Sequence, residues 1–482
     1  MLKINLNGLL TYTGYSMRKS YYYLIIIIIG SFVHPYANLY GYEGDDLLNK
    51  AEHSLHKGIE YFHSININGG YVYFYTPDMK EKWGEVPTDD YTIEVQPPGT
   101  PAVGFSFLKA YKTTGDTAFL KYAREAGEAL IKGQNKYGGW DHRINFEKEQ
   151  KKTVVSFDDN QTQSATRLLI ALDQEMKDET LHQSVMKALD LMLKAQLEQG
   201  GWPHRYPKQG NYHDYATFND AGINRCVDVM LDAYEFYKKE EYYESIVKAG
   251  RYIYISQLPP PQPGWAQQYN EFIQPAWARA FEPPSVCPVV TLNNINTLID
   301  IYMLTMNDVL LLPVMDALNW VKSVKMPNGK WPRFVELYTN KPLYYDRGRI
   351  RVDNYEDLSK ERYTGYGYER DLTDLLIKTT EHYKKIMREN NKSNTALVEE
   401  PLKEKLLEQK SNLEKSVIKI LSTQDEMGRW ITKNDKYKKA IPHKKWNGQY
   451  IIKDRISSAV FNDNINSLCD YIRVCNELEK LN

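Results

Sequence analysis

A turn built on glycine and tryptophan recurs along the chain and limits the folds that it can adopt. In the clearest copies a tryptophan stands two residues after the first glycine, as in Gly200-Gly201-Trp202. The six copies, of which the first and fourth are weaker, begin at Gly69, Gly138, Gly200, Gly264, Gly329 and Gly428. Repeats spaced by about 60 to 90 residues are typical of stacked or ringed helical hairpins. The repeats therefore predict an all-α fold, an α/α toroid, with long irregular loops and the site on one face.

Helical periodicity flanks every turn. Helices are expected before the turns at about 46–64, 117–134, 181–198, 240–256, 309–325 and 402–422. Further helices are expected after the turns at about 102–114, 163–176, 221–238, 293–306, 370–388 and 464–478. The polar stretch 389–400 resembles a linker, but the sixth hairpin lies beyond it. We therefore predict a catalytic α/α domain over 38–395 and a helical hairpin over 396–482 that completes the same toroid.

The N-terminus has the pattern of an export signal. Two cations, Arg18 and Lys19, precede an apolar run that ends near Phe32. The run is short for a membrane span, which takes about 20 residues. We predict a secretory signal peptide over 1–37, with Met17 as an alternative start. The protein is then secreted or periplasmic, or membrane-anchored if the signal is not cleaved.

The composition is that of an ordinary globular protein and gives little information about which partners the protein binds. The chain is 42% hydrophobic with a formal net charge of −1, so attraction of an anionic ligand must be local. Its 38 tyrosines and 9 tryptophans are typical of carbohydrate-active proteins, although aromatic residues also fill cores. The four cysteines lack metal-site spacing, so we expect buried thiols. We expect a monomer with no nucleic-acid partner and no stable membrane partner.

The stretch 200–221 is the strongest candidate for a binding site. It combines aromatic, cationic, amide and acidic side chains without an apolar run. Such a segment is better suited to line a cleft than to fill a core, with rings that stack on sugars and charges that hold ions. Trp202, His204 and Arg205 are therefore predicted to bind substrate.

Acidic residues stand at corresponding places of two repeats. Asp158 and Asp159 precede one predicted helix, and Asp220 precedes the next. Residues at equivalent points of neighbouring repeats can converge on one pocket, and oxygen-rich clusters suit hard cations such as Ca²⁺. The alternative is helix N-capping, which aspartate also performs.

Arginines in turn-rich loops point to recognition of carboxylates. Arg333, Arg347 and Arg362 are flanked by aromatic residues, proline or glycine, unlike Arg349 and Arg351, which fit a solvated loop. The planar guanidinium binds carboxylates through paired hydrogen bonds.

An irregular proline-rich segment adds further candidate contacts. Tyr269 and Arg279 in that segment, and Tyr363 beside Arg362, could contact a saccharide. A structural ion pair between Arg279 and Glu282 is the alternative for this arginine.

Several of these motifs together resemble polysaccharide lyase family 10, the pectate lyases. The matching stretches occur in the family's order between Asp45 and Lys384: 97–101, 157–160, 200–207, 212–221, 265–269, 278–284 and 362–366. The resemblance implies cleavage of polygalacturonate, the pectin backbone, by Ca²⁺-dependent β-elimination on an α/α toroid.

The resemblance also implies roles for individual residues. Asp220 is similar to the family's aspartate that holds Ca²⁺, and Asp158 to its partner carboxylate near the scissile bond. Arg347 is similar to the catalytic arginine that removes the C5 proton, although Asp346-Arg347-Gly348-Arg349 departs from the family's Gly-Arg-Asp-Gly, and Arg349 is the fallback. Arg333 and Arg362 are then contacts to substrate carboxylates.

Two other functions remain open. An inverting glycoside hydrolase on the same scaffold would use Asp158 and Asp220 as acid and base. A catalytically idle uronide-binding protein would keep the aromatic residues and arginines but lack turnover.

Overall fold

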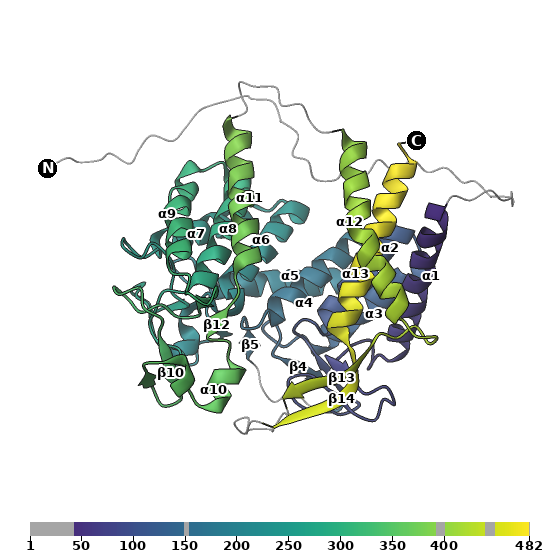
Figure 1. Ribbon diagram of the computed structural model, residues 1–482, viewed down its shortest axis with the longest axis horizontal. Coiled ribbons are helices and arrows are strands. Elements are labelled where there is room, and N and C mark those ends of the chain that lie inside the picture. The colour runs from purple at the N-terminus through teal and green to yellow at the C-terminus, as the bar shows by residue number, and fades with distance from the viewer. Residues whose placement is uncertain (1–42, 149–153, 392–400, 439–448, 482) are drawn as a thin grey trace. The chain divides into compact units, whose positions relative to one another are not determined.

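The computed structural model describes residues 43–148, 154–391, 401–438 and 449–481 (Figure 1). The predicted signal peptide lies outside the described residues, as does most of the predicted linker. Among the described residues, no helix is long and apolar enough to cross a membrane.

Twelve long helices in two alternating sets build the described chain. Those before the turns are α1 (Glu43–Ser64), α3 (Thr117–Gly133), α5 (Glu179–Ala195), α7 (Glu240–Ile255), α9 (Val314–Ser323) and α12 (Leu402–Thr423). Those after the turns are α2 (Thr100–Thr114), α4 (Gln161–Glu175), α6 (Gly222–Tyr237), α8 (Pro288–Thr305), α11 (Thr373–Asn391) and α13 (Ser458–Glu479). The short helices are α10 (Lys360–Gly365), η1 (Tyr212–Asp214), η2 (Asn219–Ala221), η3 (Asp308–Leu311) and η4 (Tyr355–Asp357). All twelve predicted helices are confirmed, and with them the all-α toroid class.

Helices of the second set form an inner layer. Contacts run in succession from α13 to α2, α4, α6, α8 and α11, while each helix of the first set packs on the inner helices beside it. The C-terminal hairpin α12–α13 packs on α2 and α1, so the last repeat contacts the first. The predicted domain boundaries themselves stay a prediction.

Each tryptophan of the turns closes the helix that precedes it. In five repeats the indole N–H donates to a backbone carbonyl near the end of that helix, at 2.7 to 3.0 Å. The donors are Trp140, Trp202, Trp265, Trp331 and Trp430. These bonds satisfy carbonyls that a helix end would otherwise leave without partners.

In several turns the first glycine fits against the next outer helix. A Cβ added to Gly138, Gly200 or Gly428 would lie 2.3 Å from a backbone oxygen of α5, α7 or α1 respectively. A hydrogen-bonded glutamine–serine pair lies at each of the same three junctions: Gln134–Ser184, Gln196–Ser245 and Gln424–Ser54. The Gly-Trp turn is therefore primarily an architectural joint between neighbouring hairpins.

Short antiparallel ladders connect the loops that follow successive turns. They pair β3 (Thr92–Glu94) with β4 (Arg143–Asn145), β5 (Val155–Ser156) with β6 (Arg205–Tyr206), β7 (Ala216–Thr217) with β8 (Gln268–Tyr269), and β9 (Trp331–Pro332) with β12 (Glu369–Arg370). A further ladder pairs β10 (Tyr344–Asp346) with β11 (Ile350–Val352). The ladders hold the long loops of different hairpins in one connected layer.

One four-stranded sheet joins the two ends of the described chain. Its order is β13 (Ile431–Lys438), β14 (Tyr450–Ser457), β1 (Phe74–Tyr75) and β2 (Lys82–Trp83). Arg455 binds it together, because its guanidinium pairs with Asp435 and lies 3.8 Å from the centre of the Phe74 ring.

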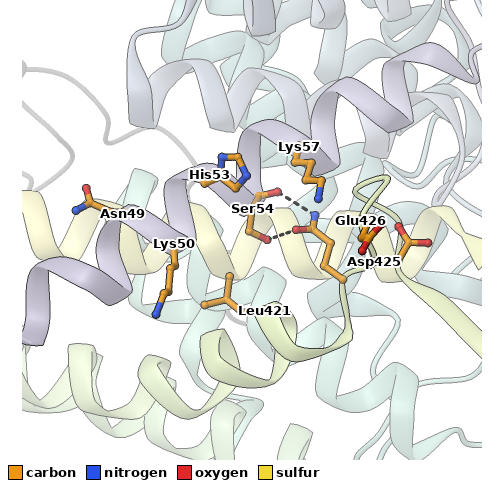
Figure 2. Close-up of a pocket in the computed structure, with 9 residues that line it drawn as sticks. Asn49, Lys50, His53, Ser54, Lys57, Leu421, Asp425 and Glu426 are labelled. Atoms are coloured by element: carbon orange, nitrogen blue, oxygen red, sulfur yellow. Dashed lines mark hydrogen bonds between the residues drawn. The ribbon is translucent and has the colours of Figure 1, made fainter.

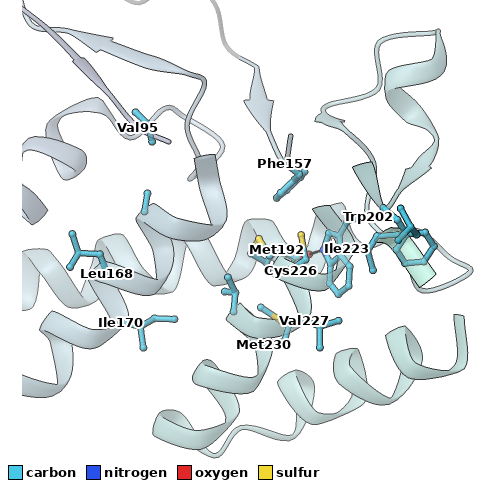
Figure 3. Packing of buried hydrophobic residues seen from close by; sticks show 14 of the residues in the cluster. Val95, Phe157, Leu168, Ile170, Met192, Trp202, Ile223, Cys226, Val227 and Met230 are labelled. Carbon is cyan, nitrogen blue, oxygen red and sulfur yellow. Dashed lines mark hydrogen bonds between the residues drawn. The ribbon is translucent and has the colours of Figure 1, made fainter. Parts of the chain in front are cut away.

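A single large apolar cluster fills the space between the helices (Figure 3). Leu168 of α4 and Val227 and Met230 of α6 have no exposed surface. Trp202 belongs to the same cluster. All four cysteines are free and buried, which confirms the expected thiols.

A groove of about 470 Å³ lies where α1 meets the end of α12 (Figure 2). Lys50, His53 and Lys57 line it from α1, and Asp425 from the turn after α12. No residue of the predicted active site lines this groove, so it marks the seam between the first and last hairpins.

The glycine joint can be tested by Gly200→Ala. Gly200 has a φ of 116° and no room for a Cβ, so we expect the free energy of unfolding to fall by roughly 2 to 4 kcal/mol. Gly210→Ala is the control, because Gly210 has a φ of 74° with nothing within 4 Å of an added Cβ. It should cost only about 1 kcal/mol. Equal shifts of the urea unfolding midpoint would contradict this account.

Candidate active site

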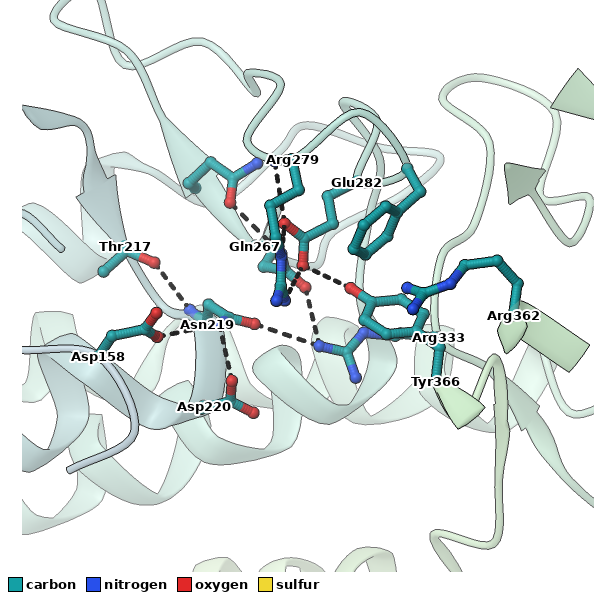
Figure 4. Close-up of polar contacts among 12 residues, drawn as sticks. Asp158, Thr217, Asn219, Asp220, Gln267, Arg279, Glu282, Arg333, Arg362 and Tyr366 are labelled. Carbon is teal, nitrogen blue, oxygen red and sulfur yellow. Dashed lines mark hydrogen bonds and ion pairs between the residues drawn. The ribbon is translucent and has the colours of Figure 1, made fainter. Parts of the chain in front are cut away.

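Three carboxylates from two neighbouring repeats converge in the loop layer. Asp158 and Asp159 follow β5, and Asp220 lies in η2 before α6. One oxygen of each carboxylate lies within 4.8 Å of the others. The Asn219 amide links the cluster, since its Nδ2 donates to Asp158 at 3.2 Å and to Asp220 at 2.7 Å (Figure 4). The predicted convergence of these residues is therefore present.

Unusual backbone conformations place these carboxylates. Asp159 and Asn160 have φ values of 47° and 62°, and Asp220 and Ala221 have values of 45° and 63°. Residues other than glycine rarely adopt positive φ, and such strain, of order 1–3 kcal/mol each, is concentrated at functional sites. The matching pairs also show that Asp159 is the structural equivalent of Asp220.

The cluster has the chemistry of a cation site. Burial and the neighbouring Asp158 and Asp220 raise the pKa of Asp159 to about 8, so the three negative charges are costly together. Hard cations such as Ca²⁺ prefer carboxylate oxygens of this kind. Asp158, Asp159 and Asp220 are the residues that would hold Ca²⁺, and their donor set fits it.

Arg333 lies against the cluster. Its Nη2 donates to Asn219 at 3.2 Å and to Gln267 at 3.4 Å, and its guanidinium lies 4.3 Å from the centre of the Tyr366 ring (Figure 4). The side chain is buried, yet its Nε–H has no partner among the described residues. Arg333 and the acidic cluster thus share Asn219 as a common neighbour.

Arg362 is the second buried arginine of the site. It stacks 4.0 Å from the Phe281 ring centre and donates to Glu361 at 2.8 Å. Its Nε and Nη1 have no partner in the described part of the chain. Buried donors without partners cost about 1–3 kcal/mol each, or more when charged. They are understandable if a ligand carboxylate completes them.

Arg279 forms the structural pair that the sequence left open, and it also faces the cluster. Its Nε and Nη2 donate to Glu282 at 2.7 and 2.6 Å. Burial opposes ionisation of Glu282, but Arg279 and the Tyr366 hydroxyl outweigh it and lower the pKa of Glu282 to about 2. For Arg279, Glu282 outweighs burial and raises the pKa, and Asp158 adds to the rise.

Arg347 is placed differently from what the family resemblance implies. Its guanidinium pairs with Glu361 at 2.7 Å and lies 4.9 Å from the Phe281 ring centre. Within the described ranges, no hydrogen bond or ion pair joins Arg347 to the acidic cluster. Arg349 lies over Trp277, at 4.7 Å from its ring. Among the described residues Arg279 likewise makes no hydrogen bond or ion pair to the carboxylates, but its charge acts on Asp159, and the charge of Asp158 acts on Arg279.

Two predicted substrate contacts prove to be core residues. Trp202 and Tyr269 have no exposed surface. The Trp202 indole is bonded to the end of α5, and the Tyr269 hydroxyl accepts from the Ala266 N–H at 2.7 Å. Neither ring can stack on a sugar in this conformation, because the repeat uses each of them to hold the turn.

The remaining predicted contacts differ in exposure. His204 is buried, and burial lowers the pKa of its imidazole to about 4. Both His204 ring nitrogens lack partners among the described residues. Arg205 is half-buried on β6, and Tyr363 is exposed beside Tyr355. His204 thus lies in the wall of the site.

Sequence reasoning gave no individual role to several polar members of the site. Asn219 and Gln267 stand inside the candidate stretches 200–221 and 265–269, so the motifs already pointed to them. Arg370 had no such signal, since only the β9–β12 ladder brings it to Arg333. Burial and Arg333 lower the pKa of Arg370, while Asp220 opposes this.

The chain is similar to known polysaccharide-degrading proteins. Residues 141–328, less than half of the chain, match the family model described as pectic acid lyase. No curated protein matches the sequence.

Solved structures share a similar arrangement at low identity. A family 10 polysaccharide lyase variant from Cellvibrio cellulosa, in complex with trigalacturonic acid, is 20% identical with a TM-score of 0.47, over 58% of this chain and 97% of that chain. The same lyase in another structure is 19% identical, with a TM-score of 0.46 over 59% and 97%. An unsaturated glucuronyl hydrolase specific for heparin is 9% identical, with a TM-score of 0.45 over 91% and 99%.

The part of the chain over residues 141–328, which holds Asp158, Asp159, Asp220 and Arg279, is therefore similar to the pectic acid lyases.

Binding of Ca²⁺ to the acidic cluster should change the unfolding temperature of the protein. We expect added Ca²⁺ to raise the unfolding temperature, because a ligand at about 100 times its Kd stabilises by about 2.7 kcal/mol. Asp220→Asn should lose most of this shift, whereas the exposed Asp463→Asn on α13 should retain it. Differential scanning fluorimetry with Ca²⁺ or chelator measures both. A full shift in Asp220→Asn would place the cation elsewhere.

Proposed function

We propose that the chain cleaves α-1,4-polygalacturonate by Ca²⁺-dependent β-elimination and releases 4,5-unsaturated oligogalacturonides. The observation that carries this proposal is the juxtaposition, through Asn219, of a three-carboxylate cluster and the buried Arg333. A polyuronate needs both features, since its carboxylates can bind arginine directly and a carboxylate cluster through a shared cation. The match to the pectic acid lyase family supports the same substrate class.

The chemistry requires that the C5 proton of a uronate become acidic. This proton is α to the carboxylate, so neutralising the carboxylate charge stabilises the carbanion that forms on its removal. Bound Ca²⁺ would supply Lewis acidity at that carboxylate. Arg333 and Arg362 would bind and orient it through their unpartnered N–H groups.

Arg279 is the proposed acceptor of the C5 proton. Its side chain is half-exposed. Arg279 lowers the pKa of Asp159, and Asp158 raises the pKa of Arg279, so the arginine lies within electrostatic range of the cluster. Arginine is a poor base at neutral pH because its pKa exceeds about 12, and Glu282 raises the pKa of Arg279 further. Its neutral fraction therefore increases about tenfold per pH unit, which explains why activity should require alkaline conditions.

The geometry disfavours the inverting hydrolase. An inverting pair needs carboxyl groups about 6.5–9.5 Å apart to admit a water molecule. Asp158 and Asp220 have oxygens within 4.8 Å of each other. An idle binder would keep the same arginines and aromatic residues, so only a measurement of turnover separates it from a lyase.

Export is part of the proposal. The cations and apolar run before residue 37 support a secreted or periplasmic enzyme acting on an extracellular polymer. Retention of the signal as an anchor is the alternative, and N-terminal sequencing of the exported protein distinguishes the two.

The activity is tested with polygalacturonate by the ultraviolet absorbance of the new C4=C5 double bond. We expect absorbance to rise with Ca²⁺ and to stop with chelator, and the rate to increase about tenfold per pH unit through the alkaline range. New reducing ends without absorbance would indicate a hydrolase. Binding without either signal would indicate an idle protein.

The base is tested by paired variants. Arg279→Ala should lower kcat by roughly 10²–10⁴-fold, as expected for loss of a general base. Arg347→Ala should mainly raise KM, with kcat within about threefold of the wild type. The reverse pattern would restore Arg347 as the base, in line with the family resemblance.

A further inference from the structure

An ion pair outside the proposed catalytic residues lies in the same loop layer. Arg143 of β4 and Glu94 of β3 are direct neighbours in their ladder, and the Arg143 Nε donates to Glu94 Oε1 at 2.6 Å. The Glu94 side chain is 1% exposed, whereas that of Arg143 is 31% exposed. The pair therefore spans from the interior to the surface.

Glu94 is fixed from several sides. A Cβ added to Gly84 would lie 1.8 Å from Glu94 Oε1, so only a glycine backbone can approach so closely. Glu94 Oε2 and the buried Tyr73 hydroxyl have no partner among the described residues. A buried carboxylate needs compensation, and here Arg143 supplies its side-chain partner. The guanidinium is consequently held at one nitrogen by a rigid support.

The terminal amino groups of Arg143 remain available. Across the described ranges, the hydrogen bonds and ion pairs of Arg143 all run through Nε to Glu94. A guanidinium anchored at Nε can still offer donors to a carboxylate outside. Its half-exposed position makes those donors accessible to a ligand.

The β3–β4 ladder that carries Arg143 adjoins the loop of Asp158 and Asp159. Nδ1 of His142, the residue before Arg143, lies 2.8 Å from Nε2 of Gln161, and Gln161 begins α4 directly after Asp159 and Asn160. Arg333 instead contacts Asn219, in the ladders that follow. In the order of the ladders, Arg143 on β4 comes before the carboxylates that follow β5 and β7, and Arg333 comes after them, directly behind β9.

We infer that Arg143, positioned by Glu94, is a carboxylate-binding subsite for a uronate residue outside the cleavage site. The inference rests on the proposed function, because it requires a bound polyuronate that extends past Asp159. We therefore expect Arg143 to contact hexagalacturonate, but not trigalacturonate held at Arg333, Arg362 and the cluster.

The test compares tri- and hexagalacturonate as substrates. Arg143→Gln should raise KM for hexagalacturonate about tenfold and leave kcat and the trigalacturonate KM within about twofold. Arg143→Lys should be intermediate, because lysine keeps the charge without the fork. Glu94→Gln should resemble Arg143→Gln, since the support is lost. The exposed Arg251→Gln on α7 is the matched control and should change nothing.

Direct binding separates this inference from the proposed function. Calorimetry with hexagalacturonate and Ca²⁺ should show weaker binding for Arg143→Gln, whose fold is checked by its unfolding temperature. If the wild type is active but Arg143→Gln keeps the same dependence on oligomer length, the subsite is wrong and the lyase stands. If the wild type neither cleaves nor binds either oligomer, both proposals fail.

Discussion

The repeated bond between a turn tryptophan and the preceding helix is the interaction on which the rest of the structure depends. It closes five helix ends, and in three of these repeats the glycine two residues earlier fits against the neighbouring hairpin. Because the tryptophan and the glycine make these scaffold contacts, the loops that follow can carry functional side chains. Those loops carry Asp158, Asp220 and Arg333, and their short ladders hold side chains from different hairpins together.

Electrostatic compensation then organises the loop layer. Three carboxylates lie close together without enough positive charge beside them to balance their own. Arg333 and Arg362 are buried, and some of their N–H donors have no partner among the described residues. Each group is costly by itself, and under the proposed function each would be completed by one part of a Ca²⁺–uronate pair. Asn219 joins the two halves, accepting from Arg333 and donating to Asp158 and Asp220. Strained backbone at Asp159 and Asp220 fits such a preorganised site.

Periodicity and the Gly-Trp repeat predicted the twelve helices, because these depend on local pattern and on burial of one face. The acidic cluster was also predictable, since equivalent repeats bring Asp158 and Asp220 to one place. Trp202 and Tyr269 were misassigned because composition cannot separate a ring that closes a helix from a ring that faces a cleft. The environments of Arg279, Arg347 and Arg370 depend on loop pairings such as β9 with β12, which no local pattern encodes.

The most direct test of the account is the position of the cation. Crystals soaked with Ca²⁺, or with a lanthanide that replaces it, and with trigalacturonate would give an anomalous difference map. The account predicts a peak coordinated by Asp158, Asp159 and Asp220, with a uronate carboxylate between that peak and Arg333. A peak at another place, or a uronate bound with its carboxylate away from both the cluster and Arg333, would contradict it.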